Sequence, residues 1–135
     1  MTAKMSVAVR NSMLDGIEGG IGVSAVLKIR TGAPPTNIAD ADSGSVLATV
    51  ALPPDWMAAA SGGSKAKSGT WQDASADAAG TAGHFRVYAS DGTTQHIQGT
   101  VTATGGGGDM TLDNAVLAAG QQFTVNTFTL TAGNA

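Results

Sequence analysis

The chain has 135 residues, a net charge of −3 and no cysteine. This length suits one domain with a single core, and the acidic balance argues against a dedicated nucleic-acid-binding protein, which usually has a basic face. The lack of cysteine excludes a disulfide framework and a thiolate zinc site. Only 13% of the residues are charged, against about 25% in a typical domain, so we expect a homo-oligomer in which partner subunits complete the surface.

The N-terminal segment carries an apolar stripe at helical spacing. Its members recur every four residues, with one more beside them: Val9, Met13, Ile17, Ile21 and Leu14. This period predicts a short amphipathic helix from about Val7 to Glu18, ended by Gly19-Gly20, within an arm of residues 1–22. The helix either caps its own β-core or docks on a neighbouring subunit. The chain has no continuous apolar h-region and no run of 18 apolar residues, so we expect neither standard export nor membrane spanning.

Alternating apolar residues predict two strands in the first half of the chain, at residues 23–30 and 45–52. Between them we expect a loop, residues 36–44, that carries Asp40 and Asp42. The segment SGGSKAKSG at residues 61–69 has the composition of a flexible exposed loop. Its two lysines are therefore expected to be solvated.

The strongest structural signal lies between residues 69 and 104. Alternating runs from His84 to Ser90 and from Thr93 to Thr104 flank the dipeptide Asp91-Gly92. Asp-Gly between two such runs predicts a β-hairpin with a tight turn, because both turn residues tolerate positive φ. The histidines His84 and His96 share parity with polar neighbours, so we expect them on solvated sheet faces.

The last predicted strand, residues 121–131, changes phase along its length. Phe123 and Val125 have one parity, whereas Phe128 and Leu130 have the other. A slip of one residue turns every following side chain to the opposite face. We therefore predict a β-bulge or sharp bend near residues 126–127, or else a strand that is buried on both faces.

These segments together predict an all-β domain over residues 23–135. Seven or eight short strands with turn signals between them are typical of an antiparallel β-sandwich or small barrel. Because the chain is poor in large apolar side chains, we expect its six aromatic residues to anchor the core: Trp56, Trp71, Phe85, Tyr88, Phe123 and Phe128.

The sequence offers little for catalysis or cofactor binding. It has no nucleophile-elbow serine and no complete phosphate-loop motif, and its aspartate pairs lack the ligand density of a calcium loop. We expect no enzyme activity, no cofactor and no metal. Trp56, Trp71 and Tyr88 could form a sugar-stacking platform, although core or interface anchoring is the favoured interpretation.

Several motifs resemble those of small structural proteins of tailed bacteriophages and prophages. They are NSMLDGIEGG at 11–20, TGAPP at 31–35, AGTAGHFRV at 79–87 and FTLTAGNA at 128–135. The resemblance extends over nearly the whole chain and transfers no catalytic residue. It implies a virion component built of β-structure and present in many copies.

From this resemblance we expect a capsid decoration, or cement, protein, made in the bacterial cytoplasm and located on the capsid surface of the virion. Its partners would be the major capsid protein or other virion subunits, with no nucleic acid and no membrane involved. The residues expected to bind a partner are the helix residues Val9, Met13, Leu14 and Ile17, and Trp56 of the proline-rich turn. A neck or tail subunit (collar or ring) and a carbohydrate- or receptor-binding module are the alternatives.

Overall fold

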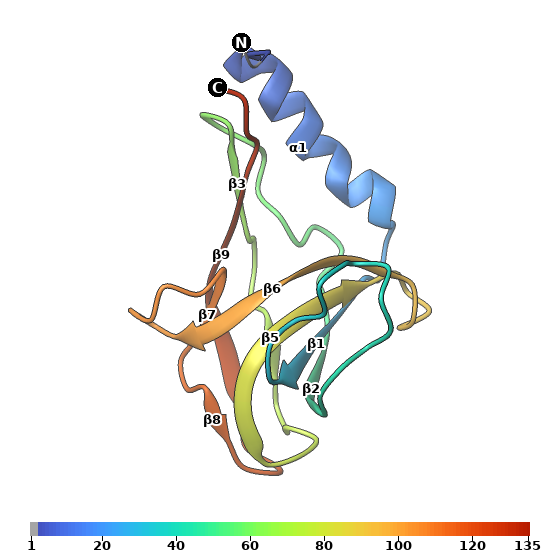
Figure 1. Ribbon diagram of the computed structural model, residues 1–135, viewed down its shortest axis with the longest axis vertical. Helices are drawn as coiled ribbons and strands as arrows, with labels where there is room; N and C mark the ends of the chain where they lie inside the picture. Colours follow the sequence, from blue (N-terminus) through green and yellow to red (C-terminus); the bar gives the residue numbers. More distant parts are fainter. Residues whose placement is uncertain (1–2) are drawn as a thin grey trace.

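The computed structural model describes residues 3–135 and contains one helix and nine strands in that range (Figure 1). In chain order these are α1 (Val7–Ile21), β1 (Val26–Thr31), β2 (Val46–Ala51), β3 (Ser64–Ala66), β4 (Gln72–Asp73), β5 (Gly80–Tyr88), β6 (Gln95–Ala103), β7 (Met110–Leu112), β8 (Val116–Leu117) and β9 (Phe123–Thr131). The first two residues of the predicted arm lie outside the described residues. No helix in the described range is long and apolar enough to cross a membrane.

Seven strands follow one path, in the order β2-β1-β5-β6-β7-β9-β3, while β4 pairs with β9 and β8 pairs with β5. The described strand pairs are antiparallel except for the pair of β6 and β7, which is parallel. The expected β-rich fold with one N-terminal helix is confirmed. The sheet is mixed rather than antiparallel, however, it has nine described strands rather than seven or eight, and its path does not close into a barrel.

A glycine-rich turn makes the parallel pair possible. Residues 104–109 connect the end of β6 to the start of β7, which lies beside β6 with Val101 facing Met110. This connection is short, because parallel neighbours usually need a dozen or more residues between them. A Cβ at Gly106 would lie 2.7 Å from the Cβ of Thr102, and one at Gly108 would lie 2.8 Å from the backbone nitrogen of Thr102. The turn is therefore packed closely against Thr102 at Gly106 and Gly108.

The predicted hairpin is present as β5 and β6, with Val87 opposite Ile97 and Phe85 opposite Gly99. Its loop is longer than the expected two residues, because Ala89 N donates to Thr94 O and leaves residues 90–93 between the strands. The carboxylate of Asp91 accepts hydrogen bonds from the backbone N–H groups of Thr93 and Thr94. This side-chain cap makes the wider turn stable without a second residue at positive φ.

The core lies between β5 and β9, and its centre is aromatic. The rings of Phe85 and Phe128 are 5.3 Å apart and nearly perpendicular, Trp71 is 5.6 Å from Phe128, and Trp56 is 5.9 Å from Trp71. Phe123 is also fully buried in this core. The expectation that the six aromatic residues are buried is confirmed, although Tyr88 is buried on the opposite face of the sheet from this cluster.

The predicted bulge in β9 is confirmed. Thr127 faces Thr111 but Val125 faces Leu112, so Asn126 is an extra residue in the ladder between them. Both Val125 and Phe128 are buried as a result. The bulge corrects the phase change and allows apolar residues of both parities to reach one core.

The outer face of β5 is buried, contrary to expectation. His84, Arg86 and Tyr88 are all 0% exposed, because the loop after β1 folds across this face and supplies backbone and side-chain oxygens to it. The expectation that His84 lies on a solvated face was therefore wrong, whereas His96 is exposed as expected.

The end of the helix and the segment at 61–69 differ from the predictions. Helix α1 continues through Gly19-Gly20 to Ile21 and ends at Gly22, whose N–H donates to Glu18 O. The predicted exposed loop at 61–69 contains strand β3, which pairs with the end of β9 and places Lys65 opposite Leu130. This two-stranded extension forms the part of the sheet against which α1 packs (Figure 1).

Candidate functional site

Helix α1 is attached to β3 by its charged residues. Lys65 Nζ of β3 lies 2.9 Å from Asp15 Oδ1 and 3.2 Å from Glu18 Oε1, and the lysine side chain is only 2% exposed. Burial lowers the pKa of Lys65, but the hydrogen bonds with the two carboxylates outweigh burial, so its pKa is raised. The hydrogen bond from Lys65 lowers the pKa of Asp15. The helix is thus held on β3 by a charged triad.

The first half of α1 is held in the same way. Arg10 Nη1 donates to Ala132 O at 3.2 Å, and Asn11 Oδ1 accepts from Gly63 N at 2.8 Å. A Cβ at Gly63 would lie 2.2 Å from Arg10 Nη1, so the arginine packs directly on this glycine. Since Arg10, Asp15 and Glu18 are the charged residues of α1, every charge of the helix faces the rest of the chain.

The opposite side of α1 is uncharged and partly apolar. Four residues share it because 3.6 residues make one helical turn: Val9, Met13, Gly16 and Gly20, which we call the outward face. Val9 is 49% and Met13 54% exposed. A Cβ added at Gly16 or Gly20 would have no atom of the chain within 4 Å, so nothing in the described residues covers this face.

An apolar groove adjoins the outward face. It has a volume of about 380 Å³ and is lined by Ile17, Gly20, Ile21, His96, Ile97 and Leu130. A neighbouring hollow of about 350 Å³ shares Ile97 and Leu130 with it and extends along β9 to Thr131. Within the described pairings, residues 129–131 pair with β3 on one side, and the β7 ladder stops at Phe128 on the other. The groove therefore borders a short open strand edge.

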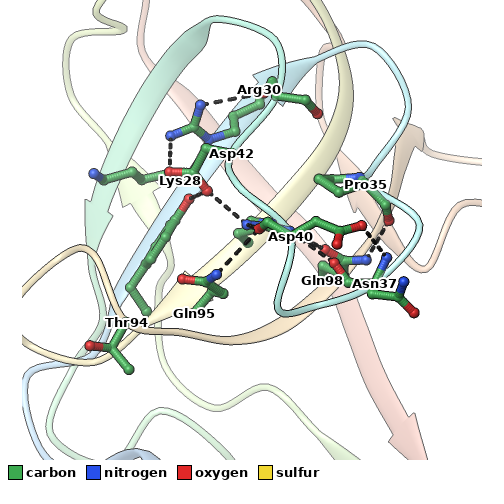
Figure 2. Close-up of polar contacts among 12 residues, drawn as sticks. Lys28, Arg30, Pro35, Asn37, Asp40, Asp42, Thr94, Gln95 and Gln98 are labelled. Carbon is green, nitrogen blue, oxygen red and sulfur yellow. Dashed lines mark hydrogen bonds and ion pairs between the residues drawn. The ribbon is translucent and has the colours of Figure 1, made fainter.

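A second candidate site is the polar cluster on the outer face of β5 (Figure 2). Asp42 accepts from Tyr88 Oη at 2.7 Å, from Arg86 Nη1 at 2.9 Å and from Arg30 Nη2 at 2.9 Å. Burial raises the pKa of Asp42, but these hydrogen bonds and the arginine charges outweigh it and lower its pKa. The Asp42 carboxylate is thus a charged anchor for the loop that carries it.

The remaining donors of Arg86 are used within the same cluster. Its guanidinium donates to Gln98 Oε1 and to the backbone oxygens of Asp40 and Asn37, and Gln98 in turn donates to Pro35 O. Because each nitrogen of this guanidinium has an internal partner, the cluster fastens residues 35–42 onto the sheet. Its chemistry is that of a structural clamp.

His84 lies beside this cluster and is buried. Its Nδ1 lies 2.9 Å from Gly32 O, and a carbonyl oxygen can only accept, so Nδ1 carries the proton. Nε2 has no partner. Burial, followed by the charges of Arg30 and Arg86, lowers the pKa of His84. Among residues 3–135 no group of three or more potential ligands (His, Cys, Asp or Glu) is placed to hold a metal ion.

The structure separates the five residues expected to bind a partner. Val9 and Met13 lie on the outward face, and Ile17 lines the groove beside it. Leu14 is 5% exposed and packs toward the sheet. Trp56 is enclosed in the core at 1% exposure, so its ring is not a surface contact. Burial of Trp56, Trp71 and Tyr88 likewise removes the sugar-stacking platform.

Sequence reasoning missed two features of this site. Lys65 was expected to be solvated, because short segments rich in glycine, serine and lysine usually are; only the carboxylates of α1 explain its burial. The helix was expected to end at Gly19-Gly20, although the spacing of four residues between Gly16 and Gly20, on the side of Met13, was a signal that they share its face.

Comparison with known proteins adds no assignment. No protein-family model, curated protein or solved structure matches this chain.

Proposed function

We propose that this protein is a structural component of a phage virion, and specifically a capsid decoration protein. The observation that carries the proposal is the outward face of α1, where Val9 and Met13 are half exposed on a helix that turns all its charges inward. An uncharged, partly apolar helix face that its own chain leaves bare is suited to contact another subunit.

The proposed action is mechanical. A protein that binds the assembled lattice but not free capsid subunits stabilises that lattice by linkage. The clamp at Arg86 and the triad at Lys65 hold loop and helix in place, so the contact surface is presented in one conformation. A sandwich-like scaffold, in which β5 and β9 face each other across the aromatic core, would support that surface from behind.

The test adds purified protein to capsids that lack it. The variant Val9→Ser/Met13→Ser should reduce occupancy and abolish the rise in capsid melting temperature that wild-type protein produces. Val23→Ser is the matched control, because Val23 is 77% exposed but lies outside the helix. Wild-type protein that binds no capsid, and is missing from purified virions, would overturn the proposal.

Point substitutions are preferable to removal of residues 1–20. Truncation would remove the helix that covers Lys65 and packs Ile17 against the core. Apolar surface that the helix now covers would then be exposed to water, which is destabilising. Loss of capsid binding by the truncated protein would then report misfolding as readily as loss of the docking arm.

A neck or tail subunit is the alternative within the same class. The copy number in purified virions distinguishes the two roles, because decoration follows the capsid lattice and a collar is a single small ring. Gold labelling distinguishes the two roles as well, because it shows whether the protein lies on the capsid or at the neck or tail. A ring stoichiometry would assign the outward face to a ring contact.

A further inference from the structure

The outward face of α1 has an ordered pattern of large and small residues. Val9 and Met13 occupy its N-terminal half, and Gly16 and Gly20 occupy its C-terminal half. Glycine is among the poorest helix formers, and a Cβ at either glycine would have no other atom of the described residues within 4 Å. The fold of this chain therefore does not account for these glycines, whereas close approach by another backbone would.

We propose that the outward face packs against the same face of a second copy, with the two α1 helices antiparallel. In this arrangement Met13 of each copy lies over Gly16 of the other, and Val9 lies over Gly20. Every large side chain then meets a position without one, and the contact is the same in both directions, as a two-fold interface requires. A parallel pair would place large residues on large ones and glycines on glycines.

Charge favours the same arrangement. The outward face carries no charged residue, so two copies can approach without burying unpaired charges. The first turn of α1 has no acidic residue and the last turn has no basic residue, so neither end of the helix dipole is compensated by a charged side chain of its own helix. In an antiparallel pair, the negative C-terminal end of each helix lies beside the positive N-terminal end of the other.

The size of the contact sets its expected strength. A helix of 15 residues is about 22 Å long, which is short for a stable interface, although the adjoining groove lined by Ile97 and Leu130 can enlarge it. We expect a dimer that dissociates on dilution. This inference rests on the proposed function, because it names a partner for the outward face that the proposed function uses. Its tests are carried out in solution, without capsids.

Disulfide trapping tests the register, because the chain has no cysteine. Tagged Met13→Cys protein is mixed with untagged Gly16→Cys protein under mild oxidation. The antiparallel pair should give mostly the mixed disulfide, and each variant alone should cross-link several-fold less. Equal or greater cross-linking of Met13→Cys with itself would overturn the antiparallel register, and no cross-linking above that of Val23→Cys would overturn the interface.

Analytical ultracentrifugation tests the close approach at the glycines. Gly16→Leu should remove the dimer, because the added side chain would occupy the space of the partner helix. The monomer fold should be unaffected, since that position is open, and an unchanged circular dichroism spectrum is the check. A wild-type protein that stays monomeric at millimolar concentration, or a Gly16→Leu protein that still dimerises, would overturn the proposal.

The two proposals fail in different ways. If the dimer exists but the protein binds no capsid, the self-contact stands and the virion role falls. If capsids are decorated by a protein that neither dimerises nor cross-links between positions 13 and 16, the virion role stands and the outward face binds a different subunit.

Discussion

The Nζ atom of Lys65 lies 2.9 Å from Oδ1 of Asp15, and this ion pair joins the tip of the sheet to the N-terminal helix. It explains how a helix with an exposed apolar stripe can still have a defined position. The side of α1 that carries its charges and Leu14 provides the attachment, which leaves the outward face with Val9 and Met13 for a partner.

The stability that the triad provides should be more sensitive to loss of its two carboxylates than to replacement of its lysine. Replacing both acids, as Asp15→Asn/Glu18→Gln, leaves the buried ammonium of Lys65 without a counter-charge and should lower the urea unfolding midpoint clearly. Lys65→Met removes the charge altogether and should have a smaller effect, because well-packed apolar replacements of buried ion pairs are often neutral. Asp55→Asn, at an exposed position, is the control; a larger loss for Lys65→Met than for the double variant would contradict this account.

Arg86 should be one of the most sensitive positions for stability. Arg86→Leu removes the donors to Asp42, Gln98 and the loop carbonyls, and we expect a loss of about 3–5 kcal/mol in the free energy of unfolding. Tyr88→Phe removes one hydrogen bond to a charged group and should cost about 1.5–3 kcal/mol.

Chemical denaturation measures both of these losses. Gln95→Ala is a matched control, because its partly exposed side chain donates to the same loop and should change stability by only about 0.5 kcal/mol. Equal losses for all three variants would argue against a clamp centred on Arg86.

Stability should fall as the pH drops below the unfolded-state pKa of histidine, about 6.5. The fold lowers the pKa of His84, so the unfolded chain binds the proton more readily, and acid favours unfolding. Asp42 adds a second loss at lower pH, because its pKa is also lowered and its protonation weakens the cluster. Thermal melts at pH 8, 6, 5 and 4 measure both effects.

His84→Asn separates the two pH effects. The asparagine amide can donate to Gly32 O in place of Nδ1, but it does not titrate. The variant should therefore lose the pH dependence between about 7 and 5 and keep the fall at lower pH that comes from Asp42. A wild-type melting temperature that is flat from pH 8 to 5 would contradict the prediction for His84.

The parity of β9 should matter more than the bulge itself. Deleting Asn126 removes the extra residue and leaves Val125 and Phe128 in regular alternation on the core face, so we expect cooperative unfolding to remain. Deleting both Asn126 and Thr127 makes Val125 and Phe128 neighbours that point to opposite faces, so we expect loss of cooperative unfolding in urea. Asn126→Ala keeps the extra residue and loses the hydrogen bond to Thr104 Oγ1, at a cost of about 1 kcal/mol. A double deletion that unfolds cooperatively at the wild-type midpoint would contradict this.

Much of the β-structure could be read from local patterns. The alternation in β5 and β6, the hairpin between them and the phase change that predicts the bulge in β9 are all properties of neighbouring residues. Side chains alternate across a strand whatever the rest of the chain does, so parity alone indicated that Val125 and Phe128 need a bulge between them to reach one core. The apolar stripe of α1 could be predicted in the same way, because helical spacing is also a property of neighbouring residues.

Tertiary structure decided which polar residues are buried and which apolar residues are not. Arg86 and His84 have the parity of a solvated face, but a distant loop covers them and supplies the oxygens that make burial of the arginine tolerable. Lys65 is buried because two carboxylates some 50 positions earlier in the chain reach it. Periodicity shows that a side chain points to one face; only the packing of remote segments determines whether water, the chain itself or a partner covers that face.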